Sequence, residues 1–549
     1  MEAPPELLET PAVALEPDDD QRAAIEHGDG PLLIVAGAGT GKTTVIARRI
    51  AHLIASKRAR PSEILALAFN DKAAAEMQER VDLLVPYGYA DVTIQTFHAF
   101  GENVLAGYGL EIGIAPGFSV LDTTSQALFL AERIDELGLK HYRPLSDPTK
   151  FVSDLASFFS RAKDDPQWPE EIRRAAADRG DQAAAARAAG GGDDALVAAL
   201  EDQASRLAEL AEAYERYNAL LWKAGFLDFG DLLALTHRLL TDSPAALRRL
   251  QQRFRYVLVD EFQDTNPVQF KIVRLLVEAH RNLVVVGDDD QSIYRFRGAH
   301  LKNILEFREH YPETKEIVLR RNYRSTQQIL ARSRRLIVQN QERLEVRYGI
   351  SKELQTEKNG TEPVWKEFEA EADEAAWVAD EIAAAVKEKR RRPRDVAILV
   401  RNNRHAEPFL RALDERGVPY YFSGSRGLFQ RPEIKELVSL LQSLFQDSRP
   451  EFLYLLASEA YGVPEDDLTK LMHALARQPA PLRALFRRAV AGRRARTLRR
   501  GEGAARPPSR RRGRPSRIRS WPKDRRGALP LPRAARHPEG PHGRPHLRG

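Results

Sequence analysis

Residues 35–44 constrain what this chain can fold into more than any other part of it. They read Val-Ala-Gly-Ala-Gly-Thr-Gly-Lys-Thr-Thr, after an apolar run at 32–35 and before a segment, 45–54, whose apolar residues recur at helical spacing. The pattern is typical of a strand, a glycine loop and a helix. Such a loop folds tightly around an anion, so that backbone N–H groups and the helix N-terminus point at phosphate. The stretch therefore predicts a site for a nucleoside triphosphate.

The positions of this loop have separate expected roles. We expect Lys42 to reach the β- and γ-phosphates and Thr43 to bind Mg²⁺. Gln21, in a capped helix start just upstream, would read an adenine edge with its amide, although a glutamine by itself is an ordinary surface residue. Ala36 stands where the strict pattern has glycine, a change between two small residues. The expected ATP contacts in the loop are Ala36, Gly37, Ala38, Gly39, Thr40, Gly41, Lys42, Thr43 and Thr44.

Further strand patterns at 64–69, 92–96, 256–259 and 283–286 alternate with helical patterns. This alternation predicts an α/β fold, a doubly wound parallel sheet with its sites at the C-terminal ends of the strands. Phe69 and His98 fall at such ends. They are either core aromatics or contacts for a single strand of nucleic acid.

Two adjacent carboxylates, Asp260 and Glu261, end the strand pattern at 256–259. They supply what the glycine loop lacks for hydrolysis. We expect Asp260 to hold Mg²⁺, and Glu261 to orient and deprotonate the attacking water.

The strand pattern at 283–286 also leads into polar chemistry. Gln291 follows it at a position suited to sensing the γ-phosphate. Tyr294, Phe296 and Arg297 come next and offer faces on which bases stack. One segment would thus touch both the nucleotide and a polymer.

Residues 316–319 are predicted to open a second α/β unit, which a strand at 396–400 continues. Tyr323 would stack on adenine, and Arg324 would reach the γ-phosphate from this separate domain. Closure of the two domains would then respond to ATP.

The amino-acid composition limits which cellular compartment and which partners to expect. The chain has no cysteine, which excludes disulfides and thiolate metal sites and fits a reducing compartment. Its start lacks a signal peptide and no stretch reaches transmembrane length, so we expect a cytoplasmic protein without a membrane partner. Residues 491–549 hold 19 Lys and Arg against 3 Asp and Glu, whereas the rest of the chain holds 65 against 75. The charge of the rest therefore argues neither for nor against nucleic acid.

The order and content of these motifs resemble the UvrD/Rep/PcrA family of superfamily 1A DNA helicases, over about residues 18–480. The carriers are the Gln21 motif and the segments 36–44, 67–75, 96–100, 227–233, 259–266, 286–299 and 319–326.

The resemblance implies ATP-driven 3′-to-5′ translocation on single-stranded DNA, with ATP and Mg²⁺ bound between two RecA-like domains that carry two helical insertions. The implied partners are single-stranded DNA, its junctions with duplex, and repair or replication proteins. The roles given above to Lys42, Thr43, Asp260, Glu261, Gln291 and Arg324 are implied too, and Phe69, His98, Tyr294 and Phe296 are assigned to DNA.

The expected layout has six parts. Residues 1–17 are a disordered leader, and 18–101 with 227–315 form the first RecA-like domain, interrupted by a helical insertion at 102–226. Residues 316–424 form a partial second RecA-like domain, 425–489 start a second helical insertion, and 490–549 are a disordered tail rich in Arg, Pro and Gly.

The sequence departs from the family pattern in two places. Residues 68–72 read Ala-Phe-Asn-Asp-Lys where the family usually has Thr-Phe-Thr-Asn-Lys, which sets a carboxylate beside the expected DNA path. The strand and the arginine-bearing helix that close the family's second RecA-like domain are missing before the tail begins. The tail is either a basic nucleic-acid-binding arm or, as we favour, the out-of-frame end of a GC-rich gene.

Three functions follow from these patterns. The first is a DNA helicase or translocase. The second is a truncated ATP- and single-stranded-DNA-binding module with little hydrolysis or unwinding, since the lost arginine finger is worth roughly 10³ to 10⁵ in rate. A P-loop ATPase unrelated to DNA is disfavoured by His98, Tyr294 and Phe296.

Overall fold

The computed structural model describes residues 16–85, 91–144, 149–188, 194–295, 298–423 and 432–445, with five positions between 455 and 464. The chain divides into two compact units, Met1–Trp365 and Lys366–Gly549, each described here by itself. Most of the expected leader and all of the expected tail lie outside the described residues.

The first unit is built on a sheet of six parallel strands in the order β3-β2-β6-β7-β1-β8. β1 lies between β7 and β8, with Ile34 opposite Val286 on one side and Ile317 on the other. The predicted α/β class with a parallel sheet is confirmed. The strands are β1 Leu32–Ala36, β2 Ile64–Ala68, β3 Thr93–Thr96, β6 Tyr256–Val259, β7 Leu283–Gly287 and β8 Lys315–Leu319.

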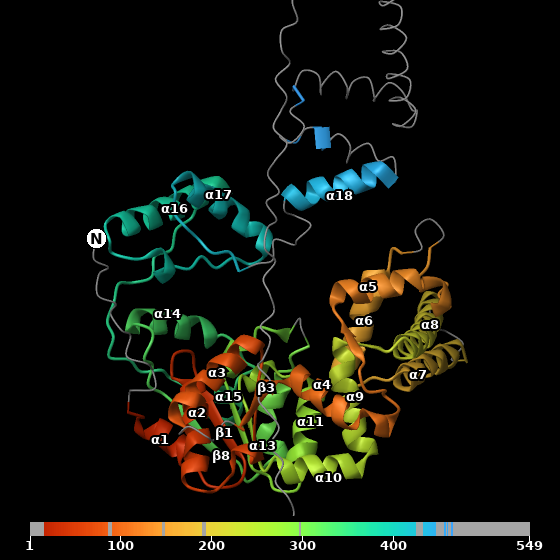
Figure 1. Cartoon of the computed structure of the whole chain (residues 1–549), viewed down its shortest axis with the longest axis horizontal. Helices are drawn as coiled ribbons and strands as arrows, with labels where there is room; N and C mark the ends of the chain where they lie inside the picture. The colour runs from red at the N-terminus through yellow and green to blue at the C-terminus, as the bar shows by residue number, and fades with distance from the viewer. Residues whose placement is uncertain are drawn as a thin grey trace, which may run out of the picture. The chain divides into compact units, whose positions relative to one another are not determined.

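Helices cover both faces of this sheet (Figure 1). Because side chains alternate along a strand, Leu32 and Ile34 pack with α1, α2 and α3, whereas Leu33 and Val35 pack with α4, α9, α10 and α11. Each fully buried aliphatic side chain of this kind contributes about 1.5–3 kcal/mol. The helices are α1 Asp19–Ile25, α2 Lys42–Ala55, α3 Asp71–Leu84, α4 Phe97–Tyr108, α9 Phe229–Asp242, α10 Pro244–Arg253 and α11 Pro267–Val277.

The sequence predicts that residues 316–319 open a second α/β unit, and for the strand this prediction is wrong. β8 is the edge strand of the first sheet, and the N–H of Lys315 donates to the carbonyl of Pro31 at 3.1 Å. Without β8, β1 would present unpaired backbone groups at the sheet edge. The segment after β8 therefore starts within the first unit, with α14 Gln327–Ile337 and α15 Leu344–Tyr348.

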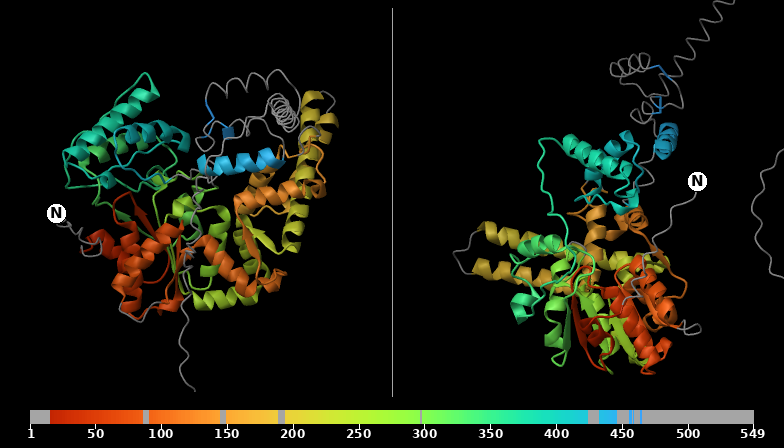
Figure 2. Two further views of the ribbon diagram at one scale, coloured as in Figure 1. Left: turned by 45° about the horizontal axis from the view of Figure 1, so that its top comes forward. Right: turned by 90° about the vertical axis from the view of Figure 1, so that its left-hand side faces the viewer.

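The residues at which a helical insertion is predicted are mainly helical. A short parallel pair, β4 Ser119–Leu121 and β5 Phe226–Asp228, brackets α5 Thr123–Glu132, α6 Val152–Asp164, α7 Pro169–Ala188 and α8 Asp194–Lys223. Figure 2 shows α7 and α8 as two long helices side by side. Phe159 of α6 stacks on Tyr214 and Tyr217 of α8, with ring centroids 5.2 and 4.9 Å apart, in a separate apolar core.

The described part of the second unit holds helices α16 Glu371–Lys387, α17 Glu407–Glu415 and α18 Pro432–Phe445. The strand predicted at 396–400 does not form. Ile398 and Val400 pack against a small core of α16 and α17, but Leu399 is 94% exposed. No strand lies among residues 366–423, all of which are described, so this extended segment has no ladder to join.

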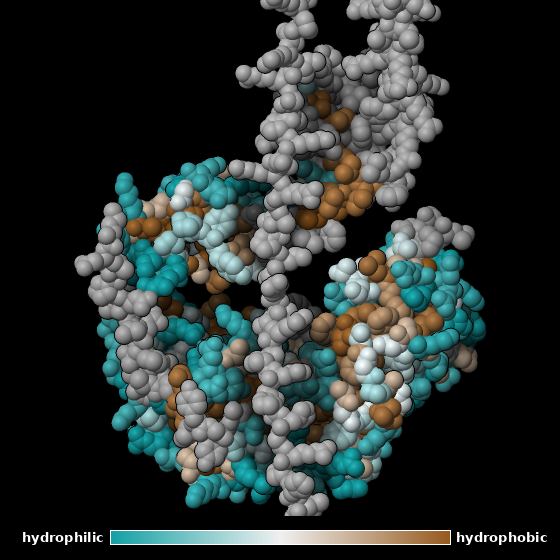
Figure 3. Space-filling view, in the orientation of Figure 1, coloured by the Kyte–Doolittle hydropathy of each residue, from teal (hydrophilic) through white to brown (hydrophobic). Residues whose placement is uncertain are grey.

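Polar side chains cover most of the described surface in the view of Figure 3. Some apolar side chains are also exposed, among them Leu110 and Leu128. Within the described ranges, no helix combines the length and the apolar character needed to cross a membrane.

Candidate nucleotide-binding site

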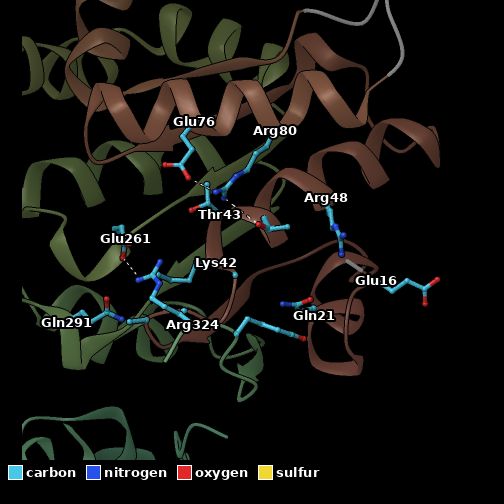
Figure 4. Close-up of a pocket in the computed structure, with 15 residues that line it drawn as sticks. Glu16, Gln21, Lys42, Thr43, Arg48, Glu76, Arg80, Glu261, Gln291 and Arg324 are labelled. Carbon is cyan, nitrogen blue, oxygen red and sulfur yellow. Dashed lines mark hydrogen bonds and ion pairs between the residues drawn. The ribbon is translucent and has the colours of Figure 1, made fainter. Parts of the chain in front are cut away.

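A cavity of about 390 Å³ lies where the loop after β1 meets the first turn of α2. Such a volume falls in the range of small-ligand sites. Figure 4 shows Lys42, Glu261, Gln291 and Arg324 gathered on one side of it and Gln21 and Arg48 on the other. The lining residues are Glu16, Gln21, Ala38, Gly39, Gly41, Lys42, Thr43, Thr44, Arg48, Glu76, Arg80, Glu261, Gln291, Tyr323 and Arg324.

The loop takes its shape from backbone that only glycine adopts easily. Gly39 and Gly41 have φ of 81° and 88°. A Cβ at Gly39 would also lie 2.7 Å from Cβ of Arg324, so the loop and Arg324 pack directly. Thr40 is fully buried, and its hydroxyl donates to the carbonyl of Gly37 at 2.8 Å.

Of the nine predicted loop contacts, six line the cavity and three shape the loop behind it. The three are Ala36, which is the last residue of buried β1, with Gly37 and Thr40. At Gly37 an added Cβ would lie 2.9 Å from Cδ1 of Leu354.

Lys42 and Glu261 form the ionic centre of the cavity. Lys42 Nζ lies 2.6 Å from Glu261 Oε2, and Gln263 Nε2 donates to the same oxygen at 2.9 Å. The backbone of Glu261 is left-handed, with φ 47° and ψ 48°, a conformation that costs of order 1 kcal/mol or more. This turn carries the carboxylate from the end of β6 toward the loop lysine.

Asp260 lies behind Glu261, buried, and its Oδ1 accepts the N–H of Glu261 at 2.9 Å. Burial and the charge of Glu261 raise the pKa of Asp260 to about 7. Thr43 lines the cavity, whereas Asp260 does not. A hydroxyl and a buried carboxylate are oxygen donors of the kind that Mg²⁺ prefers, so these two residues fit a Mg²⁺ site, and their role stays a prediction.

Gln291 reaches the cavity from the short turn after β7. Its Nε2 donates to Asp288 Oδ2 at 2.7 Å. Gln263 ties this turn to the end of β6, because its Oε1 accepts the N–H of Asp288 at 3.0 Å. The neighbouring ends of two strands are thus joined by one amide side chain.

The segment after β8 forms another wall. Asn322 Nδ2 donates to the carbonyl of Ala38 at 2.6 Å, and the N–H of Tyr323 donates to the carbonyl of Gly39 at 2.8 Å. Tyr323 and Arg324 therefore line the cavity from the same compact unit as the loop. This corrects the expectation that Arg324 arrives from a separate domain.

Gln21 belongs to a bonded set at the other side of the cavity. Its Nε2 donates to the carbonyl of Thr40 at 2.9 Å, which leaves one N–H of the amide for a base edge. Asp18 caps α1 through the N–H of Gln21 and accepts the hydroxyl of Tyr323 at 2.6 Å. Burial and Asp18 raise the pKa of Tyr323 to about 12, so its phenol keeps its proton.

Four lining residues escaped the sequence analysis: Glu16, Arg48, Glu76 and Arg80. Arg80 of α3 forms an ion pair with Glu76 and lies 3.4 Å from the hydroxyl of Thr44. Spacing carried a signal for one of them, since Arg48 follows Thr44 by one helical turn and faces the same side. Arg80 had no such signal, because only packing of α3 beside α2 brings it there.

Three of the residues assigned to DNA, Phe69, His98 and Tyr294, lie in two aromatic pairs. The rings of Phe69 and Tyr294 lie 5.0 Å apart, and those of His98 and Phe229 lie 5.8 Å apart. Burial lowers the pKa of His98, which favours a neutral ring. Phe296 and Arg297 lie outside the described residues. The assignment of Phe69, His98 and Tyr294 to DNA stays a prediction.

Comparison with known proteins supports the helicase resemblance. Residues 18–312 match the UvrD/REP helicase N-terminal domain, and residues 317–483 match the UvrD-like helicase C-terminal domain. The chain is 34% identical over 459 residues to an ATP-dependent DNA helicase PcrA of Leuconostoc citreum, covering 83% of this chain and 56% of the relative. It is 36% identical over 454 residues to PcrA of Bacillus subtilis, covering 82% and 56%.

A mycobacterial relative gives the same result. Identity to the ATP-dependent DNA helicase UvrD1 of Mycobacterium tuberculosis is 36% over 435 residues, covering 77% of this chain and 52% of the relative. The chain spans about half the length of the curated relatives it matches. The match to the N-terminal helicase domain nevertheless extends over more than half of this chain and includes the whole cavity except Glu16, Tyr323 and Arg324. The chain therefore belongs to the UvrD/Rep helicase family.

Proposed function

We propose that this chain hydrolyses ATP to move 3′-to-5′ along single-stranded DNA and to separate strands at duplex junctions, in DNA repair or replication. One observation carries the proposal. The cavity unites Lys42, Glu261, Gln291 and Arg324, which come from four separate segments of the chain. A cation, a carboxylate, an amide and a second cation around one volume are the groups that phosphoryl transfer to water requires.

Each side chain has its own proposed role in ATP hydrolysis. Phosphates in the loop give Lys42 a second anionic partner besides Glu261, which sets the Glu261 carboxylate free to orient water and take its proton. Gln291 and Arg324 stabilise charge on the transferred phosphoryl group. Thr43 and Asp260 would hold Mg²⁺, which neutralises phosphate charge when bound.

The proposed coupling to DNA rests on how close a nucleotide contact, Gln291, and a DNA contact, Tyr294, lie in the sequence. Tyr294 follows Gln291 by three residues, and its ring lies against Phe69. A shift of the 288–291 turn on hydrolysis would therefore move an aromatic pair on which bases stack. Such a link is what a translocase needs.

The test measures ATP hydrolysis by the 549-residue chain with and without single-stranded DNA. We expect stimulation by DNA, and a loss of at least about 10²-fold in turnover for Glu261→Gln with ATP affinity kept, because this substitution removes only the base. Equal turnover with and without DNA would reject the translocase.

A second candidate is an ATP- and single-stranded-DNA-binding module that hydrolyses slowly. The observation favouring it is the helical second unit, in which residues 366–423 form no strand and Leu399 stays exposed. DNA binding by fluorescence anisotropy with and without ATP, measured beside ATP turnover and duplex unwinding, distinguishes the two candidates. ATP-sensitive DNA binding without DNA-stimulated turnover supports the module, whereas unwinding of a duplex with a 3′ single-stranded tail rejects it.

A further inference from the structure

Three consecutive aspartates converge on one lysine beside the cavity. Lys352 Nζ lies 3.2 Å from Asp288 Oδ1, 2.6 Å from Asp289 Oδ1 and 2.8 Å from Asp290 Oδ2. Its side chain is 6% exposed. Burial alone lowers the pKa of Lys352, but the carboxylates outweigh burial and the pKa is raised, so the ammonium stays charged.

The same three carboxylates have ligand atoms close enough together to hold a metal ion. The cluster is filled from within the protein instead. Arg343 donates through Nε and Nη2 to both oxygens of Asp290, at 2.6 and 2.8 Å, in the paired geometry that suits guanidinium and carboxylate. The N–H of Leu344 donates to Asp289 Oδ2 at 2.8 Å. Two cations and a backbone donor occupy the positions that a metal ion would need.

Asp288 connects this cluster to the cavity. One of its oxygens contacts Lys352, and the other accepts Nε2 of Gln291 at 2.7 Å. A carboxylate only accepts hydrogen bonds, so Asp288 fixes which end of the Gln291 amide it faces. The second N–H of that amide remains for a partner in the cavity.

Lys352 belongs to a segment that also packs against the glycine loop after β1. Leu354 packs against Gly37. The N–H of Gln355 donates to the carbonyl of Arg320 at 2.8 Å, and its carbonyl accepts the N–H of Asn322 at 2.7 Å. The segment that carries the lysine is therefore packed on the loop and hydrogen-bonded to the segment that leads to Arg324.

We propose that Lys352 is a positioning residue that acts through Asp288 to hold the Gln291 amide with an N–H toward the γ-phosphate, so that the cavity distinguishes ATP from ADP. The proposal rests on the proposed function of the cavity. Without Lys352, three carboxylates share one arginine, and their mutual repulsion displaces Asp288 and, with it, the Gln291 amide that it holds.

The test compares the affinities of the full chain for a non-hydrolysable imido analogue of ATP and for ADP, by competition with a fluorescent nucleotide. We expect Lys352→Met to lower the preference for the analogue about tenfold, the size of one hydrogen bond to a charged group, with ADP affinity within about twofold. Gln291→Ala should lower it as much, and Lys352→Met added to Gln291→Ala should lower it no further. Lys271→Met removes an exposed lysine and should leave both affinities unchanged.

Asp288→Asn is the second variant, because it leaves Lys352 with two aspartates and keeps the shape of the site. It should reproduce the loss of preference. Equal weakening of ADP and the analogue, or a further loss in the Gln291→Ala background, would show a structural role and overturn the proposal. An unchanged preference in Asp288→Asn, or a wild-type chain without any preference, would also overturn it.

The affinity ratio needs no turnover. A wild-type chain that prefers the analogue but does not hydrolyse ATP would therefore contradict the proposed function and leave the role of Lys352 supported.

Discussion

Lys42 and Lys163 are both lysines paired with carboxylates in the first unit, yet their surroundings differ. Lys163 of α6 is fully buried, 2.7 Å from Asp228 Oδ2 and 2.9 Å from Asp231 Oδ1, and the hydroxyl of Tyr217 donates to Asp228 at 2.8 Å. Lys42 has a single carboxylate partner at 2.6 Å, and the two side chains are 10% and 33% exposed.

This difference predicts a structural role for Lys163 and a role in ligand binding for Lys42. Lys163 has two carboxylate partners within the protein and ties α6 of the insertion to the start of α9 on the sheet. Burial lowers its pKa but the two carboxylates raise it more, so the net direction is upward. Lys42 faces a cavity, and under the proposed function its one carboxylate partner would be exchanged for phosphate. Four predictions test this comparison.

Removing the buried cation should have the largest effect. Lys163→Met leaves Asp228 and Asp231 buried without their cation, and we expect the free energy of unfolding to fall by about 3–5 kcal/mol. Urea unfolding measures the loss. Lys271→Met breaks an exposed pair with Asp165 and should cost less than about 0.5 kcal/mol. Equal effects of the two variants would contradict a structural role for Lys163.

Substitution of Lys42 should have a large effect on ATP hydrolysis and a small effect on stability. Lys42→Ala should lower the rate of ATP hydrolysis by about 10²–10³-fold, as expected for a donor to transition-state charge, and change unfolding free energy by less than about 1 kcal/mol. Steady-state ATPase rates and urea unfolding on the same preparation check both halves. A large loss of stability would place Lys42 in the same class as Lys163.

The aromatic pair should affect DNA without affecting nucleotide. Phe69→Ala removes the ring that packs on Tyr294, and we expect a loss of about 1–3 kcal/mol in single-stranded DNA binding. Anisotropy titration with labelled oligonucleotides measures it. Leu110→Ala, at an exposed apolar residue, is the control and should leave DNA affinity unchanged.

The smallest effect should come from Asp164, the neighbour of Lys163. Its Oδ1 accepts Nδ2 of Asn266 at 2.8 Å, and burial raises its pKa to about 6. In the unfolded chain the Asp164 carboxyl has an ordinary pKa near 4, so it loses its proton at a lower pH than in the folded protein. The free energy of unfolding therefore falls as the pH rises from about 4 to 6.

Asp164→Asn removes the loss of stability that comes from ionising this buried carboxyl. The variant should be more stable than wild type by about 1 kcal/mol at pH 7.5, with the advantage vanishing toward pH 4. Urea midpoints at several pH values check this, and a constant difference across the range would mean that Asp164 does not titrate as its surroundings predict.

The agreement between sequence and structure depends on how local each feature is. The β1–loop–α2 unit follows from a contiguous pattern: its strand starts at Leu32, as predicted, and its helix starts at Lys42, shortly before the apolar spacing at 45–54. β8 was assigned to the wrong unit because a strand's partner is set by pairing at long range, here with β1 almost three hundred residues earlier. No sequence pattern around Lys352 predicts that it lies against the three aspartates.

The sequence by itself determined the α/β class, the phosphate loop and the acidic end of β6, because each is a short run whose chemistry and periodicity can be read in place. Only the tertiary structure decided that Arg324 reaches the loop from the first unit, that Lys352 fills the aspartate cluster, and that Lys163 is structural whereas Lys42 faces a cavity. The reason is physical: the role of a charge depends on its burial and on the number of its partners, and residues far apart in the chain supply both.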